Sequence, residues 1–233
     1  MAVFVLADLH LSLTSDKPMD VFNGRWQNYQ DKIRQRWLTL VKDGDTVVIP
    51  GDISWAMTLE EAVADLKWLD DLPGEKIISK GNHEYWWSTA TKIHKAFEEN
   101  SISSIKLLHN NALRAENFAI CGTRGWFTES NAPKNSDYDK IVARECQRLR
   151  RSLECARADY PEFERLVFLH FPPALEGFVC PEIIEVMKEF EVKRCFFGHI
   201  HGNYNLPKSF VYEGIQMRLI SSDFLDFYPH IIN

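Results

Sequence analysis

The chain has 233 residues, a length that suits one compact domain and is short for two ordinary ones. Its hydrophobic share of 45% and charged share of 26% match those of soluble globular proteins and exclude a disordered or fibrous chain. The formal net charge of -6 at pH 7 would repel a nucleic-acid backbone, so long nucleic acid is disfavoured as a partner.

The first residues lack the positive flank and the apolar stretch of a secretory signal. No later run approaches the roughly 18 apolar residues of a membrane span. We therefore expect a cytoplasmic protein with no membrane span. The 5 cysteines are an odd number without a C-x-x-C pair, which argues against a disulfide framework and a thiolate zinc site.

Short apolar runs predict buried strands along the chain, and periodic segments between them predict helices. The predicted strands cover 2–7, 46–50, 76–79, 165–169 and 194–197. The predicted helices cover 26–40, 59–69, 88–100 and 140–158. Thr58, followed by Glu61 three residues later, predicts a capping box at the second helix. Strands that alternate with helices indicate an α/β core.

Two hairpins are predicted over 112–122 and 211–220, which indicates a second, partly antiparallel sheet beside the first. No linker or internal repeat divides the chain, so we interpret 1–233 as a single domain. A turn-rich stretch before the last predicted helix indicates a cap or insertion at about 128–158.

The helix over 140–158 is predicted to be amphipathic. Val142, Cys146, Leu149 and Leu153 share one face, and Arg144, Arg148 and Arg151 lie on the opposite one. A solvated charged face explains these arginines. The alternative is a basic cap that steers an anionic substrate or a lipid headgroup.

A polar cluster directly follows each of the five predicted strands. The clusters are Asp8-Leu9-His10, Gly51-Asp52, Gly81-Asn82-His83-Glu84, His170 and Gly198-His199-Ile200-His201. Open α/β sheets build their binding crevice at the carboxyl ends of their strands, so we expect these side chains to meet in one place. A single cluster would be a loop charge or a core histidine, but five together favour a functional site.

In this order, the blocks D-x-H, G-D, G-N-H-E, H and G-H-x-H resemble those of the calcineurin-like metallophosphoesterases over residues 8–201. The resemblance implies an α/β fold, namely a two-layered mixed β-sheet sandwich flanked by helices. It also implies a binuclear metal centre.

The same resemblance implies which residue binds which ion. The first metal would be held by Asp8, His10 and His201, the second by Asn82, His170 and His199, and Asp52 would bridge the two. Oxygen and imidazole ligands suit two divalent transition-metal ions (Mn, Fe, Zn, Co or Ni) and disfavour Ca or Mg alone. Such a pair activates water and stabilises in-line displacement at phosphorus. We therefore expect a phosphomonoesterase or phosphodiesterase acting on a small substrate.

Two further residues are candidates for roles beside the metals. By the resemblance, His83 faces the substrate and is the general acid, with Glu84 or Asp52 keeping its imidazolium charged. Arg124 lies between two glycines, a placement that suits a substrate clamp for a phosphate or carboxylate. A surface salt bridge is the alternative for Arg124.

The second block departs from one subclass of the family. Protein serine/threonine phosphatases extend it to G-D-x-x-D-R-G, whereas Trp55 stands here in the place of the second carboxylate and the arginine is absent. A phosphoprotein phosphatase is therefore disfavoured, and monoesters and diesters are equally compatible with the metal core.

A rival interpretation is a catalytically silent metal-binding interaction module of the same fold, as one retromer subunit is. A silent relative is expected to lose His83 or several ligands, and none is missing from this sequence.

Overall fold

The central strands alternate their side chains between two buried layers. In β1 (Val3–Val5), Val3 and Val5 join one apolar cluster, whereas Phe4 joins another. Because successive side chains of a strand point to opposite faces, such a strand needs a packing partner on both sides. A computed structural model, which describes residues 1–17, 19–22, 24–126 and 137–232, provides these partners as two stacked sheets with helices outside.

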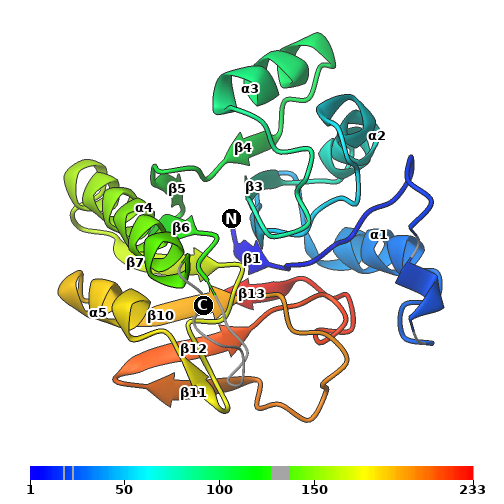
Figure 1. The fold of residues 1–233 in the computed structure, drawn as a ribbon. Coiled ribbons are helices and arrows are strands. Elements are labelled where there is room, and N and C mark those ends of the chain that lie inside the picture. The colour runs from blue at the N-terminus through cyan, green and yellow to red at the C-terminus, as the bar shows by residue number, and fades with distance from the viewer. Residues whose placement is uncertain (18, 23, 127–136, 233) are drawn as a thin grey trace.

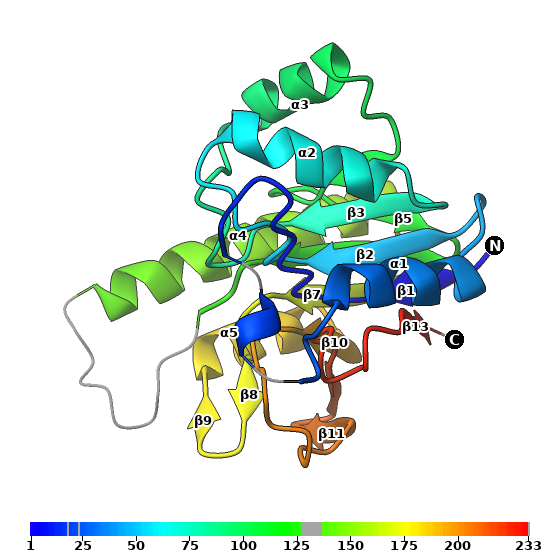
Figure 2. The same cartoon turned by 90° about the vertical axis from the view of Figure 1, so that its right-hand side faces the viewer.

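The first sheet has the order β13-β1-β2-β3-β4. Its further strands are β2 (Thr46–Pro50), β3 (Glu75–Ser79), β4 (Ile105–Leu107) and β13 (His230–Ile232). Strands β1 to β4 are parallel, and β13 pairs antiparallel with β1. Its outer face is covered by α1 (Tyr29–Leu40), α2 (Leu59–Asp70) and α3 (Ala90–Glu99) (Figures 1 and 2).

The second sheet has the order β11-β12-β10-β7-β6-β5. Its strands are β5 (Leu113–Ala115), β6 (Phe118–Thr123), β7 (Glu164–Leu169), β10 (Arg194–Phe197), β11 (Ser209–Tyr212) and β12 (Ile215–Leu219). The four inner strands are parallel, and β5 and β11 pair antiparallel at the edges. Helices α4 (Tyr138–Asp159) and α5 (Pro181–Glu189) cover its outer face (Figure 1).

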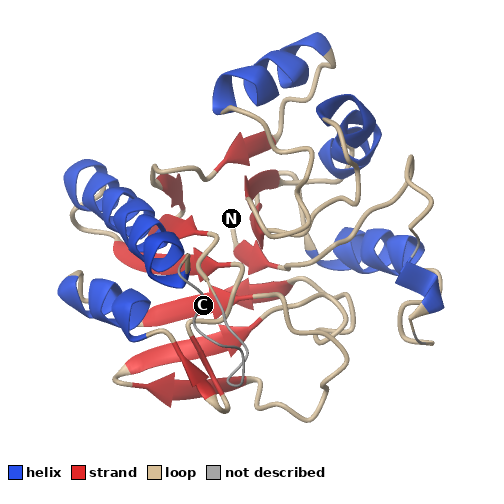
Figure 3. Cartoon of the chain, viewed as in Figure 1, coloured by secondary structure: helices blue, strands red, loops and turns tan. Residues whose placement is uncertain are grey.

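Three apolar clusters hold these layers together. One lies between the sheets and includes Val48 and Phe168, and the other two lie beneath the helices on either side. The strands accordingly occupy the middle of the molecule and the helices its two flanks (Figure 3). A short 3-10 turn, Met19–Val21, and a small hairpin of β8 (Ala174–Leu175) and β9 (Phe178–Val179) complete the elements.

The predicted fold class is confirmed, and so are the five strands, the four helices and both hairpins, with ends that differ by up to three residues. The sequence interpretation missed α5, β4 and β13. The two strands have three residues each and depend on pairing with β3 and β1, which a local pattern does not reveal. No helix within the described ranges is long and apolar enough to cross a membrane.

The predicted amphipathic helix is α4, and its apolar face packs on the second sheet with Val142, Cys146, Leu149 and Leu153 buried. The first part of the predicted cap or insertion at about 128–158 falls in residues 127–136, which lie outside the described residues, and the rest of it is α4. The interpretation of 1–233 as a single domain stays a prediction.

The capping box at α2 yields a test of local stability. The Thr58 hydroxyl accepts the backbone N–H of Glu61, and the Glu61 carboxylate accepts that of Thr58. We expect Thr58→Ala to lower the free energy of unfolding by about 1 kcal/mol, because a helix N–H loses its acceptor. Urea unfolding measures the change. Thr58→Ser keeps the hydroxyl, and an equal loss in that variant would contradict the capping role.

Candidate metal centre

The predicted ligands lie on loops at the carboxyl ends of strands from both sheets. In chain order the loops follow β1 (Asp8 and His10), β2 (Asp52), β3 (Asn82), β7 (His170) and β10 (His199 and His201). Backbone hydrogen bonds join neighbouring loops: the N–H of Asp8 donates to the carbonyl of Gly51, and that of Gly198 to the carbonyl of His170. Side chains that are up to 193 positions apart in the sequence therefore meet at one edge of the sandwich.

The side chains form two candidate metal-binding groups. One is Asp8, His10 and His201, the other is Asp52, His170 and His199, and within each group the ligand atoms all lie within 4.8 Å of one another. In the first, the Nε2 atoms of His10 and His201 are 3.2 Å apart. In the second, His170 Nε2 lies 2.6 Å from Asn82 Oδ1. The two groups and Asn82 together contain the seven residues that the resemblance implied, and their assignment as metal ligands stays a prediction.

Asp52 lies between the two groups. Its Oδ2 atom is 3.4 Å from His170 Nε2 and 3.8 Å from His10 Nε2. Its Oδ1 atom accepts the backbone N–H of His83 at 2.9 Å. This is the place that a bridging carboxylate needs, and the bridging role itself stays a prediction.

The backbone is strained at ligands of both groups. The φ angles of Asp8, His10, Asp52 and His199 are 60°, 48°, 52° and 71°. Residues other than glycine rarely adopt this left-handed region, and each such residue costs on the order of 1 to 3 kcal/mol. Other non-glycine residues of the described chain, such as Asn28 and Ser101, share this region, so the strain agrees with a functional site but does not by itself identify one.

Two glycines in the sequence blocks allow the carboxylates to approach the backbone. A Cβ atom on Gly81 would collide with the carboxylate of Asp52, and one on Gly198 with that of Asp8. The space that the missing side chains leave is filled by the predicted ligands themselves.

Two buried carboxylates outside the predicted ligand set hold these loops in place. Glu84 accepts the backbone N–H groups of Gly81, Asp52 and Ile53, so it fixes the turn that carries Asp52. Asp223 accepts from Nδ1 of His201 at 2.7 Å and from the N–H of Gly202 at 3.0 Å. It follows β12, and a polar cluster after the predicted hairpin was the available signal.

Burial and mutual repulsion change the pKa values of these groups. Burial raises the pKa values of Asp8 and Asp52, and in the case of Asp52 the neighbouring Glu84 and Asp8 add to the rise. Burial and the surrounding histidines lower the pKa values of His10 and His170. Burial alone would lower the pKa of His201, but its hydrogen bond with Asp223 and the negative charges of Asp8 and Asp223 together outweigh burial and raise this pKa.

His83 lines a cavity of about 380 Å³ that opens onto both groups. Its Nε2 atom lies 3.9 Å from Asp52 Oδ2, and its ring is 4.2 Å from that of Trp55, between centroids. The rest of the lining is largely apolar and aromatic and includes Met19, Phe22 and Trp26.

The two carboxylates that were expected to keep the His83 imidazolium charged differ in position. Glu84 binds backbone N–H groups, whereas Asp52 Oδ2 lies 3.9 Å from His83 Nε2. Burial, followed by the charges of His201 and Lys17, lowers the pKa of His83.

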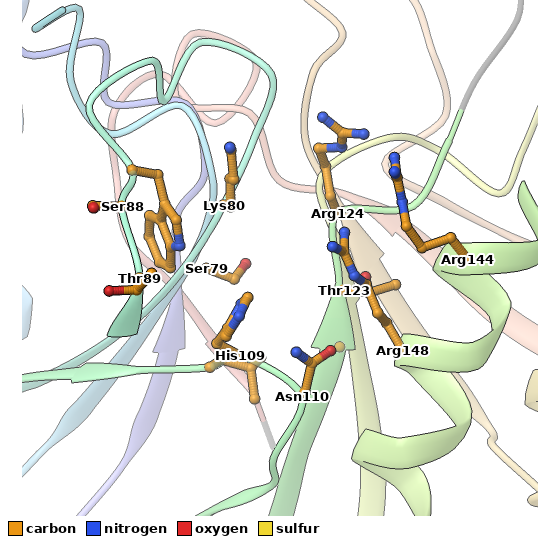
Figure 4. Close-up of a pocket in the computed structure, with 13 residues that line it drawn as sticks. Ser79, Lys80, Ser88, Thr89, His109, Asn110, Thr123, Arg124, Arg144 and Arg148 are labelled. Carbon is orange, nitrogen blue, oxygen red and sulfur yellow. The ribbon is translucent and has the colours of Figure 1, made fainter. Parts of the chain in front are cut away.

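Arg124 lies outside this cavity. Its backbone carbonyl accepts the N–H of His170 at 3.1 Å, while its guanidinium lies over the rings of Trp126 and Phe171. The side chain lines a neighbouring cavity of about 410 Å³ together with Lys80 and two arginines of α4 (Figure 4). Its role as a substrate clamp stays a prediction.

Comparison with solved structures shows the same fold at low sequence identity. The protein AQ665 of Aquifex aeolicus, of unknown function, has a TM-score of 0.52 at 15% identity, with 99% of this chain and 95% of that chain covered. The phosphopantetheinyl hydrolase of Mycobacterium tuberculosis has a TM-score of 0.54 at 12% identity, with coverages of 99% and 95%. TT1561 of Thermus thermophilus has a TM-score of 0.59 at 9% identity, with coverages of 99% and 97%.

No curated protein matches the sequence. The family model described as calcineurin-like phosphoesterase matches residues 1–203. Because that match includes all seven predicted ligands, the chain belongs to the calcineurin-like phosphoesterases, a family whose members are in general metal-dependent hydrolases of phosphoesters.

Proposed function

We propose that this protein is a binuclear metal-dependent phosphoesterase that acts on a small substrate. The observation that carries the proposal is the convergence of two three-residue ligand groups from both sheets, with Asp52 between them. A fold kept only for stability has no need to bring carboxylates and imidazoles together out of water.

The donor set suits transition metals. The groups combine carboxylate oxygens with imidazole nitrogens and contain no thiolate, a set that favours Mn, Fe, Zn, Co or Ni. The facing nitrogens of His10 and His201 are 3.2 Å apart, close enough together to bind the same cation. Asp8, His10 and His201 would hold one ion, Asn82, His170 and His199 the other, and Asp52 both.

Two bound cations would supply an activated water and stabilise the negative charge that develops on the phosphoryl oxygens. His83 has the place of a general acid, since it lines the cavity between the candidate ligands and solvent. It would give a proton to the departing ester oxygen, a step worth roughly 10²- to 10⁴-fold in rate.

The cavity supports a small substrate. Its volume is about 380 Å³, which is within the range of small-ligand sites. The ring of Trp55, stacked on His10 with centroids 4.9 Å apart, closes one side of it. A protein or a long nucleic acid would need a more extended surface than this cavity provides.

We expect chelation to abolish hydrolysis of an aryl phosphate ester and Mn²⁺ to restore it, because water is a poor nucleophile near neutral pH without the metals. Metal should also raise the melting temperature, since ions bound by the folded state alone stabilise it. Parallel assays of a monoester and a diester across several metals identify the preferred reaction. A metal-stabilised protein with no activity on any ester would instead support the silent interaction module.

We expect His83→Ala to keep both metals and to lose at least about 10²-fold in kcat on esters with poor leaving groups, and much less on nitrophenyl esters. A nitrophenolate leaves without a proton, whereas an alkoxide does not. The measurement is kcat over a series of leaving-group pKa values, with bound metal quantified. His94→Ala, an exposed histidine on α3, is the matched control. An equal loss across the series would remove the general-acid role.

We expect Asp223→Asn to weaken metal binding by roughly 10- to 100-fold. The substitution removes the carboxylate that orients His201 and accepts the hydrogen bond of its Nδ1 atom. Competition with a metal indicator measures the affinity. Asp226→Asn, which lies on the same loop and pairs with Arg36, should bind metal as the wild type does. Unchanged affinity in Asp223→Asn would mean that His201 needs no such support.

A further inference from the structure

A second cavity adjoins the candidate metal centre on the side of the second sheet. It has a volume of about 410 Å³ and lies between the ends of β3 and β6, the start of α3 and one face of α4. Lys80 projects from one wall, and Arg124, Arg144 and Arg148 from the other (Figure 4). The proposed function makes no use of these four cations.

This cavity is close to the candidate ligands along the chain and through the backbone. Lys80 precedes Asn82 by two residues, so their Cα atoms are at most about 7 Å apart. Arg124 accepts the N–H of His170 through its carbonyl at 3.1 Å. The second cavity is therefore lined by residues next to the candidate ligands in the chain and in the fold.

The cavity carries an excess of positive charge. In the described part of the chain, the carboxylate that forms ion pairs with these cations is Glu145, at 2.7 Å from Arg148 and 3.8 Å from Arg144. Glu145 is fully buried and also accepts the hydroxyl of Thr123 at 2.5 Å. Four cations around one carboxylate leave a formal excess of three positive charges, which an anion of the substrate would neutralise.

The guanidinium of Arg124 is positioned by aromatic rings and has a buried donor that an anion could pair with. Its guanidinium is braced over the rings of Trp126 and Phe171, at 5.2 Å and 6.0 Å from their centroids. Its Nε atom is buried and has no hydrogen-bond partner among the described residues. A buried donor without an acceptor is costly, and a phosphate or carboxylate oxygen would remove that cost.

The two cavities differ in the chemical character of their lining residues. The lining over the candidate ligands includes aromatic rings and Met19 but no arginine or lysine, whereas four cations line the second cavity. The guanidinium group of arginine commonly donates hydrogen bonds to the oxygens of phosphates and carboxylates.

We propose that the second cavity binds another anionic group, a phosphate or a carboxylate, of the same molecule whose phosphoester lies at the metal centre. The protein is then selective for phosphoesters that carry a second anion. This inference rests on the proposed function and specifies its substrate class.

Calorimetric titration of the Mn²⁺-loaded protein tests the proposal. The probes are alkyl phosphonates, ω-carboxyalkyl phosphonates and alkane bisphosphonates of matched and increasing chain length. For at least one chain length, we expect a probe with two anionic groups to bind at least about 10-fold more tightly than the probe with one anionic group. The bisphosphonate and carboxylate arms tell which anion is preferred.

The variants separate the cavity from general attraction by a basic surface. Arg144→Met changes an exposed residue of the cavity wall, and Lys80→Met changes the opposite wall. Both should reduce the preference to less than about 3-fold. Arg151→Met removes the same charge from the same helix but lies outside the cavity, so this variant should keep the preference for probes with two anionic groups. Circular dichroism verifies that each variant is folded.

Two outcomes overturn the inference: no preference at any chain length, or an equal loss of preference in Arg151→Met. A parallel assay of aryl phosphate hydrolysis keeps the two proposals distinguishable. Hydrolysis without any preference would refute the second anion site and leave the phosphoesterase standing. If the protein hydrolyses no ester but shows a preference that Arg144→Met removes, the second anion site stands and the phosphoesterase proposal is refuted.

Discussion

The burial of Asp52 between two groups of imidazoles is the constraint on which the rest of this structure depends. Its carboxylate is removed from water, close to Asp8 and Glu84, and burial together with these acids raises its pKa. A low-dielectric site of this kind disfavours a free carboxylate and favours one that is bound to cations. The parallel strands of both sheets end at this place, and their loops supply the other ligands.

The surroundings of the ligands fix them before any cation binds. Glu84 holds the loop of Asp52 by three backbone hydrogen bonds, and Asp223 fixes the ring of His201 through Nδ1. Ser222 donates its hydroxyl to the carbonyl of Asp8 at 2.6 Å. These contacts keep the left-handed backbone at the ligands in place, so the strain is carried by the surrounding fold instead of relaxing.

In our two proposals, one cavity is the site of hydrolysis and the other recognises a second anionic group of the substrate. The cavity lined by His83 and Trp55 is where the phosphoester would react, with an apolar wall that limits water. The cavity lined by Lys80 and Arg124 carries the charge that would recognise the rest of the substrate. Members of this family can therefore share a metal core and differ in selectivity, because selectivity resides in the surrounding loops and helices.

The local sequence by itself determined the polar clusters, the five strands that precede them, both hairpins and four of the helices, since periodicity, caps and turns act over a few residues. Its ordered blocks, through the family resemblance, predicted seven ligands that the structure brings together at one edge of the sandwich, and their binding of metal stays a prediction. Only the tertiary structure revealed that Glu84 binds backbone N–H groups, that Asp223 supports His201, and that Arg124 faces Lys80 across a cavity. These contacts join different strands and loops, and no local pattern encodes which of them meet when the two sheets stack.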